Sequence, residues 1–413
     1  MTHVASRRRP ERVAVIGAGV AGLSTAWFLQ EHGICVTVYD RGGIGAGSSR
    51  GNAGWIVPEL VEPLPSPAML KSIIPAMLRP AGALRIPLVP RPALWRFLAG
   101  TARQCTAARW QRSMHSLVGI TAMALAAFEL LGDAGVDVNT DDAEPLLACF
   151  RTAAQRDAMA LELRCMRAAG QPVKSSNISG DDARGLEPCL SGEVTAAIAV
   201  EGQRFLDPLA FVTSLADSVR GRGAQLCFGH DVTDVIDDGD QVLVSTASGD
   251  PARFDAAVIA TGAWFNRLAK TFGVRVPVHA GRGYSFSIAV TPTPARPLYF
   301  PVQRVACTPI QGRLRLAGMM EFRDADTPFD PRRIAAMVKA TAPMLHGAEF
   351  GDRHDEWVGP RPCTADGLPL IGATSSPRVF GCGGHGMWGM VLGPVSGQLL
   401  AQQISSGSPV PAL

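Results

Sequence analysis

Residues 12–40 read RVAVIGAGVAGLSTAWFLQEHGICVTVYD, and this stretch decides the fold. Residues 12–16 are an apolar run typical of a buried parallel strand. Residues 20–32 have the apolar periodicity of a helix, and Gly33 stands where such a helix ends. Residues 34–39 form a second apolar run. The sequence therefore predicts a strand–helix–strand unit of an α/β fold.

Three glycines, Gly17, Gly19 and Gly22, connect the first strand to the helix at G-x-G-x-x-G spacing. In dinucleotide-binding proteins the first allows a tight turn, the second lets a pyrophosphate approach the backbone, and the third lets helix pack on strand. Asp40, at the end of the second strand, is placed to accept hydrogen bonds from ribose hydroxyls and would repel a 2′-phosphate, which disfavours NADP. The alternative is a glycine-rich turn in a nucleotide-free domain, but the ordered combination favours a dinucleotide.

The bulk composition describes a folded protein. The chain has 413 residues, 47% of them hydrophobic and 18% charged, which suggests two or three structural units with ample core. A net charge of +3 is too small to indicate nucleic-acid binding. The nine cysteines are scattered without C-x-x-C or metal-ligand spacing, so we expect no metal site and a reducing cytoplasm. The basic first residues are interpreted as a short tail rather than a signal peptide, and no run of 18 apolar residues predicts a spanning helix.

Two further segments have distinctive composition. Residues 41–59, RGGIGAGSSRGNAGWIVPE, are too rich in glycine and serine for a helix. We expect an extended loop whose amides and hydroxyls line a cofactor, with a flexible linker as the alternative. Residues 63–128 contain no Asp or Glu, and their arginines alternate with apolar residues between prolines. This pattern predicts peripheral contact with an anionic membrane surface, on the inner face of the cell membrane, or else an ordinary helical insertion packed on the body.

Features typical of nucleotide binding occur near the start, around residues 230–264 and at the end of the chain. We therefore expect a Rossmann-like domain assembled from discontinuous segments, with an inserted α+β substrate domain that carries a mixed or antiparallel sheet. The predicted boundaries are 1–62, 185–265 and 358–413 for the first domain, and 63–184 and 266–357 for the second. Residues 115–170 are predicted to be helical, 175–190 to form a loop, 207–208 to start a helix, and 331–345 to form another helix.

Several motifs resemble one family. They are VAVIGAGVAGLSTAWFLQEHGICVTVYD (13–40), GSSRGNAGWIVP (47–58), AAVIATGAW (256–264), GRGYSF (281–286), WVGPRPCTADGLPLIG (357–372) and GCGGHGMWGMVLGPVSGQLLA (381–401). Over nearly its whole length the chain is similar to the D-amino-acid oxidase superfamily of FAD enzymes, nearest its bacterial D-amino-acid dehydrogenase branch of the small-subunit type. The resemblance implies non-covalent FAD, a substrate-domain sheet over the flavin, and oxidation of an amino acid to its imino acid.

The resemblance also implies positions for the cofactor. The glycine loop would hold the pyrophosphate, Asp40 the ribose, the 47–54 loop the pyrophosphate and flavin, Val232 the adenine, and the loop from Gly384 the pyrimidine end of the flavin. The full set is Gly17, Ala18, Gly19, Val20, Ala21, Gly22, Asp40, Arg41, Ser48, Ser49, Asn52, Ala53, Gly54, Val232, Thr261, Gly262, Gly384, His385, Gly386 and Met387. Relatives with a covalent flavin attach it near Gly359, and Cys363 does not obviously replace that cysteine.

Three residues are predicted to carry the chemistry. Arg361, in GPRP, corresponds to the arginine that binds the substrate carboxylate, which suits its planar fork; a structural pair with Asp366 is the alternative. Tyr284 is expected to hydrogen-bond the same carboxylate, or else to be a half-buried sheet tyrosine. His385 is expected to stabilise the reduced, anionic flavin, or else only to brace its loop. No strong base is required if the amine binds neutral and the α hydrogen leaves as hydride to flavin N5.

The predicted function is FAD-dependent oxidation of the Cα–N bond of D-amino acids, including cyclic ones such as D-proline and D-hydroxyproline. We expect the electrons to pass to a respiratory-chain or quinone-type acceptor rather than to oxygen. Two alternatives remain open: an oxidase of the glycine or sarcosine type that produces peroxide, and a flavin-carrying subunit of a larger electron-transfer complex. Peroxide formation would distinguish the oxidase from the dehydrogenase. Reduction of the flavin in the isolated chain by an amino acid would argue against the subunit of a larger complex.

Overall fold

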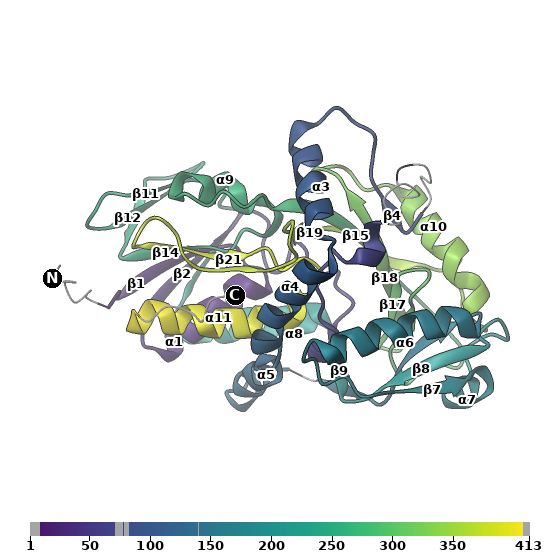
Figure 1. Cartoon of the computed structure of the whole chain (residues 1–413). Helices are drawn as coiled ribbons and strands as arrows, with labels where there is room; N and C mark the ends of the chain where they lie inside the picture. The colour runs from purple at the N-terminus through teal and green to yellow at the C-terminus, as the bar shows by residue number, and fades with distance from the viewer. Residues whose placement is uncertain (1–8, 71–76, 78–81, 139, 408–413) are drawn as a thin grey trace.

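The computed structural model describes residues 9–70, 77, 82–138 and 140–407, and it consists of two halves built on two large sheets. In Figure 1 the half with the N-terminal strands lies at the left and the half with the longer strands lies at the right. The expected α/β class, with a Rossmann-like part and a second part carrying a mixed sheet, is confirmed.

The first half is a six-stranded sheet in the order β10-β2-β1-β14-β21-β20. Its first five strands are parallel and β20 is antiparallel to β21. The predicted unit is present as β1, α1 and β2. The bounds are β1 (Arg12–Ile16), β2 (Cys35–Asp40), β10 (Gln225–Phe228), β14 (Ala256–Ile259), β20 (Leu370–Ala373) and β21 (Val379–Gly383).

Both faces of this sheet are covered, which explains why β1 is apolar throughout. Val13 and Val15 pack toward α1 (Val20–Glu31), α8 (Pro208–Gly221) and α11 (Gly389–Ser406). Ala14 and Ile16 pack toward α9 (Phe265–Ala269) and a three-stranded sheet of β11 (Val232–Asp237), β12 (Val242–Thr246) and β13 (Ala252–Phe254). Short 3-10 turns η2 (Gly262–Trp264) and η3 (Lys270–Phe272) flank α9.

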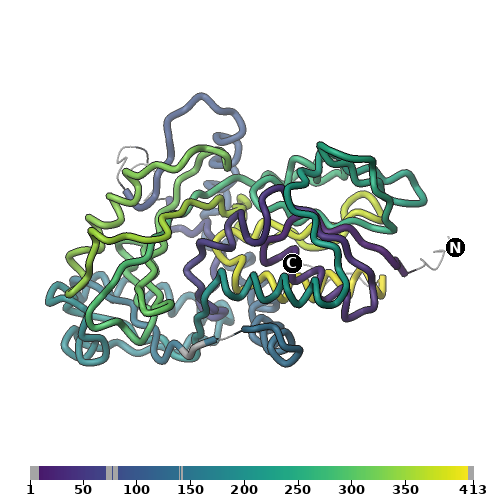
Figure 2. The backbone as a smooth tube through the Cα atoms, turned by 180° about the vertical axis from the view of Figure 1, so that it is seen from behind, coloured from purple at the N-terminus to yellow at the C-terminus, as the bar shows by residue number. Residues whose placement is uncertain are grey.

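Helices from the first and the last parts of the chain meet in this half, where α11 lies against α1 (Figure 2). Two glycines of α11 make the close approach. A Cβ on Gly397 would lie 2.6 Å from the backbone of Ser24 and Thr25, and one on Gly393 would lie 3.0 Å from Val20. Since no side chain fits at Gly397, this glycine allows α11 to pack closely against α1, the helix that follows the glycine loop.

The second half is a nine-stranded sheet in the order β19-β15-β18-β17-β16-β6-β8-β7, with β4 paired to β18. Helices α10 and α6 flank it (Figure 1). Its strands are β4 (Leu84–Arg85), β6 (Leu146–Phe150), β7 (Ser175–Ser179), β8 (Ala196–Val200), β15 (His279–Ile288), β16 (Leu298–Phe300), β17 (Val305–Ile310), β18 (Arg313–Phe322) and β19 (His354–Cys363). The helices are α6 (Ala153–Ala168), α7 (Gly180–Leu186), α10 (Pro331–Thr341) and η4 (Ala342–Met344).

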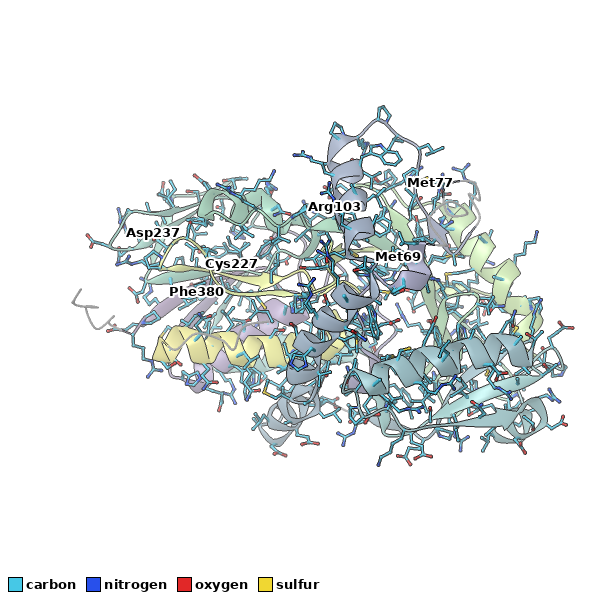
Figure 3. All side chains as sticks on the ribbon, viewed as in Figure 1. Met69, Met77, Arg103, Cys227, Asp237 and Phe380 are labelled. Carbon is cyan, nitrogen blue, oxygen red and sulfur yellow. The ribbon has the colours of Figure 1, made fainter. Side chains whose placement is uncertain are left out.

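A small sheet and three helices connect the halves. The sheet contains β3 (Trp55–Ile56), β9 (Gln203–Phe205) and β5 (Asp141–Ala143), and η1 (Pro58–Leu60) follows β3. The helices are α3 (Pro92–Gln104), α4 (Ala107–Thr121) and α5 (Ala124–Asp133). In Figure 3 Cys227 and Phe380 mark the first half, Met69 and Met77 the second, and Arg103 the α3 helix.

Some predicted boundaries do not follow the sheets. Strand β8 lies inside the predicted segment 185–265, yet it pairs with β6 and β7 in the larger sheet. Strand β19 also belongs to that sheet up to Cys363. The 115–170 region is not helical throughout, because fully buried β6 interrupts it, and residues 175–190 form β7 and α7 rather than a loop. The helix start at Asp207 is confirmed: its side chain accepts from the amides of Leu209 and Ala210.

Residues 107–133 have the length and mean hydropathy, 1.6, of a membrane span, contrary to the prediction. In the structure they form α4 and α5, and one side of these helices belongs to the core beside α11, whereas Met123 and Leu130 are exposed. Met114, Leu117 and Phe128 are almost completely buried there. This burial is typical of core helices in a folded protein.

Candidate active site

A cavity of about 1420 Å³, counting its open mouth, lies where the parallel strands of the first half end. Ligands of open α/β sheets bind at this edge. The cavity is lined by the glycine loop, the 40–52 loop, the start of β11, the end of β14, the edge strand β19 and the start of α11. It therefore brings together the three discontinuous segments that the sequence analysis identified.

The glycine loop has no room for side chains. Gly17 has a φ of +118°, and a Cβ there would lie 2.4 Å from the carbonyl oxygen of Ala260. A Cβ on Gly22 would lie 1.9 Å from the carbonyl oxygen of Gly17. The loop is thus held against β14 and α1, and its backbone faces the cavity at Gly17 and Gly19. This is the cradle that a pyrophosphate requires.

Asp40 organises the turn beside this cradle. One carboxylate oxygen accepts from the amide of Ala18 at 2.8 Å, and the other from those of Gly42 and Gly43 at 2.7 and 2.9 Å. A carboxylate offers about four acceptor positions, so one is left for a ribose hydroxyl. Ser49 caps α1 from the neighbouring loop, because its Oγ accepts from the amide of Val20 at 3.1 Å.

Thr261 provides an independent sign of a missing partner. It lies at the end of β14, it lines the cavity, and its Oγ1 is buried without a hydrogen-bond partner. Buried hydroxyls are rarely left unpaired in folded proteins. A ligand in the cavity would satisfy this hydroxyl, so the glycine cradle and Thr261 together fit a bound dinucleotide.

Arg361 projects from β19 over β15. Its Nη1 donates to the carbonyl of Met319 at 2.6 Å and its Nη2 to that of Gly318 at 3.4 Å. These carbonyls belong to a β-bulge, in which Met319 and Met320 of β18 stand opposite the single residue Gly283. Burial lowers the pKa of Arg361. Within the described part of the chain no carboxylate pairs with it, Asp366 included.

His385 lies in the loop before α11, only 4% exposed. Its Nε2 is 2.9 Å from the Oγ of Ser396, and the next amide, that of Gly386, donates to the carbonyl of Pro362 at 2.8 Å. The loop is therefore tied to β19 next to Arg361. Burial lowers the pKa of His385 to about 4, which keeps the imidazole neutral at ordinary pH.

Most of the predicted site residues line this one cavity. They are Gly17, Gly19, Val20, Ala21, Asp40, Arg41, Ser48, Ser49, Asn52, Val232, Thr261, Gly262, Arg361, His385 and Gly386. Six others lie behind or beside it: Ala18, Gly22, Ala53, Gly54, Gly384 and Met387. Gly54, for example, packs on the carbonyl of Leu206, which a Cβ would approach to 2.0 Å. These six shape the loops, and their backbones do not face the cavity.

Tyr284 does not lie in the cavity, so the expectation that it contacts the substrate carboxylate is wrong for this structure. It is 1% exposed, and its hydroxyl donates to the Oε2 of Glu321 at 3.0 Å. The reason is strand alternation. A Cβ on Gly283 would lie 2.1 Å from the Nη2 of Arg361, so Tyr284, the next residue on β15, points to the opposite face of the sheet.

Two interacting groups at the cavity were not predicted, although Arg41 in the second was itself a predicted cofactor residue. Arg267 pairs with Asp231 at 3.1 Å, and both residues line the cavity beside Val232. Trp264 and Arg41 form the second group with Asp326. The guanidinium of Arg41 stacks 4.0 Å from the Trp264 ring centroid, and both side chains bond the Asp326 carboxylate at 3.0 Å. Trp264 falls in a motif already noted, but nothing in the sequence places Asp326 beside it.

Cys363 is a poor candidate for a covalent flavin link. It is 1% exposed in an apolar cluster that includes Phe97 and Phe322. Burial raises the pKa of its thiol to about 12, so the thiolate that such a bond requires is disfavoured. Non-covalent binding remains our prediction.

The site and fold define an oxidoreductase of the dinucleotide-binding type, and comparison with known proteins identifies its family. The profile described as FAD dependent oxidoreductase (DAO) matches residues 12–403. The chain belongs to this DAO family of FAD-dependent oxidoreductases, and its cofactor is FAD.

Relatives cover the whole chain. It is 28% identical over 411 residues to a D-amino acid dehydrogenase of Azorhizobium caulinodans, an alignment that covers 96% of this chain and 97% of that protein. Among solved structures, glycine oxidase from Bacillus cereus superposes with a TM-score of 0.71, at 20% identity and 98% and 99% coverage. An FAD-bound L-α-glycerophosphate oxidase from Mycoplasma pneumoniae superposes with a TM-score of 0.67, at 16% identity and 98% and 97% coverage. At these identities the structures show a shared fold only.

Proposed function

We propose that this enzyme oxidises the Cα–N bond of D-amino acids, including cyclic ones such as D-proline. The observation that carries the proposal is the guanidinium of Arg361, which lines the FAD cavity with no carboxylate partner among the described residues. A partly desolvated cation of this kind favours a carboxylate ligand, and the arginine fork holds it in two hydrogen bonds. The similarity to a D-amino acid dehydrogenase supports the choice of substrate.

The residues of this chain would align the substrate. Arg361 fixes the carboxylate, so the α carbon of a bound amino acid lies one bond from a group held at a defined position. FAD, when bound, supplies the hydride acceptor. The start of α11, at Gly389 and Met390, faces the cavity, and its positive dipole end stabilises negative charge that develops there. His385, neutral and hydrogen-bonded to Ser396, adds an uncharged polar group at the same place.

An anaerobic spectral screen with paired D- and L-amino acids, including both prolines, tests this function. The FAD of the purified chain should lose its visible absorbance with D enantiomers and keep it with L enantiomers. Bleaching by L enantiomers or by glycine alone would contradict the proposal. Failure of the pure chain to react with any amino acid would favour a subunit of a larger complex.

We also propose a respiratory-chain or quinone-type electron acceptor. Support comes from the relative named a dehydrogenase and from the acid-free region around α3. Trp95 and Leu88 there are 38% and 66% exposed, and Arg96 and Arg103 of the same region are also exposed. Such a surface suits anionic lipid headgroups. Turnover with quinone analogues should exceed peroxide formation, and the enzyme should sediment with anionic but not zwitterionic vesicles.

A further inference from the structure

The face of β19 that carries Arg361 also carries Trp357 and Gly359, since side chains two residues apart on a strand share a face. Trp357 is half-buried and is the first residue of the 357–372 motif, which assigned it no role. Its indole lies flat on the strand. A Cβ on Gly359 would lie 1.7 Å from Cη2 and 2.0 Å from Cζ2 of the ring.

A second glycine covers the other side of the ring. Gly51 is buried in the glycine-rich loop, one residue before the cavity-lining Asn52. A Cβ on Gly51 would lie 2.0 Å from both Cδ2 and Cε3 of Trp357. The indole is therefore held between β19 and the loop that runs along the FAD cavity, and neither neighbour has room for a larger residue.

The indole and the guanidinium of Arg361 cover neighbouring positions on this face of the sheet. That guanidinium covers Gly283, whose Cβ would lie 2.1 Å from Nη2. Gly283 and Gly359 are direct partners in the β15–β19 ladder, and Cβ positions of such partners are about 4.5–5.5 Å apart. Neither glycine has a side chain, so the guanidinium of Arg361 occupies the space above Gly283 and the ring of Trp357 occupies the space above Gly359. The two groups therefore lie side by side.

We propose that Trp357 is a specificity-determining residue that limits the size of the substrate side chain and favours compact apolar ones. This inference rests on the proposed function. If Arg361 holds the carboxylate, the other groups on the α carbon lie within a few bond lengths of it. The indole is an apolar surface next to that anchor, just outside the residues that line the cavity, and the close approach of Gly51 and Gly359 restricts its movement.

The test compares Trp357→Ala and Trp357→Phe with the wild-type holoenzyme. The readout is kcat/KM for D-alanine, D-valine and D-phenylalanine. The ratio of D-phenylalanine to D-alanine should rise at least tenfold in Trp357→Ala and less in Trp357→Phe, because one or two methylenes of pocket volume change selectivity by about 10–200-fold. Leu161→Ala, on the exposed side of α6, is the control and should leave the ratio unchanged.

A second readout needs no turnover. Dissociation constants of acetate and benzoate are measured from the change in flavin absorbance, and the benzoate-to-acetate preference should rise in Trp357→Ala. If wild type reacts with no amino acid yet binds both carboxylates, the proposed function fails while this readout still tests Trp357. Unchanged ratios in both variants overturn the inference. So does loss of FAD with unchanged selectivity in Trp357→Phe, which would make the indole a structural wedge only.

Discussion

Two arginines on neighbouring strands of the larger sheet, Arg282 fully buried and Arg361 half-buried, have opposite surroundings. Arg282 of β15 lies 3.4 Å from the Oε2 of Glu321, and it donates to the carbonyls of Thr327 and Pro328 at 2.6 and 2.9 Å. Arg361 of β19, on the other face, donates to the carbonyls of Met319 and Gly318 and to the Sδ of Met320, and the described residues offer it no carboxylate. On the first face the arginine is paired with a carboxylate of the protein, whereas on the second face the arginine is available to a ligand in the cavity.

The difference shows how one sheet separates stability from binding. Glu321 is completely buried and is shared by Arg85, Arg282, Arg323 and the Tyr284 hydroxyl. Such a cluster needs every member, because removing one leaves a buried charge uncompensated. Removing an arginine from water also costs free energy when no carboxylate pairs with it. A carboxylate on the ligand offsets this desolvation cost. The following changes test this separation.

Arg282→Ala should have the largest effect, and on stability alone. It leaves Glu321 short of its nearest buried cation, which typically costs about 3–5 kcal/mol. Urea unfolding of the holoenzyme would measure this loss, while KM of the folded fraction should stay within a factor of about two. A large rise in KM with normal stability would show that the two faces are not separate.

Arg361→Ala should have the reverse effect. Loss of a desolvated carboxylate partner costs roughly 3–4 kcal/mol of binding, so KM should rise about 10²–10³-fold while FAD remains bound. Arg361→Lys should recover part of this loss, since it keeps the charge without the fork. A normal KM in Arg361→Ala would remove this residue from the substrate site.

His385, beside Arg361, should make stability depend on pH. Its pKa of about 4 in the folded state lies below the ordinary value of 6.5, so the unfolded chain binds the proton more readily. The free energy of unfolding is therefore not reduced by His385 above pH 6.5. It falls as the pH falls toward 4, by about 2 kcal/mol between pH 7.5 and 5. Unfolding at both pH values should show this loss reduced in His385→Asn. Equal pH dependence in variant and wild type would exclude His385 as the source.

Tyr284→Phe should cost about 1–2 kcal/mol of stability, because Glu321 loses a buried hydrogen-bond donor. KM should not change, since the hydroxyl faces away from Arg361. Thermal unfolding and steady-state kinetics on the same preparation would measure both. An increase in KM comparable to that of Arg361→Ala would return Tyr284 to the substrate site.

Asp326→Asn should have the smallest effect. Its pair with Arg41 is exposed, at 67% and 40% for the two side chains, and such pairs contribute less than about 1 kcal/mol. FAD release, followed by the rise in flavin fluorescence, should accelerate only a few-fold, and less at high salt. Asp217→Asn, in the remote Arg220 pair, is the control. Equal rates in both variants would show that Asp326 does not help to retain FAD.

The sequence predicted the cofactor end of the site better than the substrate end, for physical reasons. The cradle at Gly17, Gly19 and Asp40 is built from backbone within one local unit, so spacing alone predicts it. The substrate side depends on which face of a strand a residue occupies. Tyr284 was assigned to the wrong face because the face follows from pairing with β18 and β19. Trp357 was missed because its partner Gly51 is 306 residues away in the chain.

The central claim, that Arg361 anchors the carboxylate of a D-amino acid against FAD, is tested most directly by a double comparison. The rate constant of anaerobic flavin reduction is measured for D-alanine and for D-alaninamide, in wild type and in Arg361→Ala. Wild type should prefer the acid at least 100-fold, and the variant should show almost no preference, since the amide lacks the charge and the second acceptor oxygen that Arg361 recognises. An equal preference for the acid in both proteins would contradict the account.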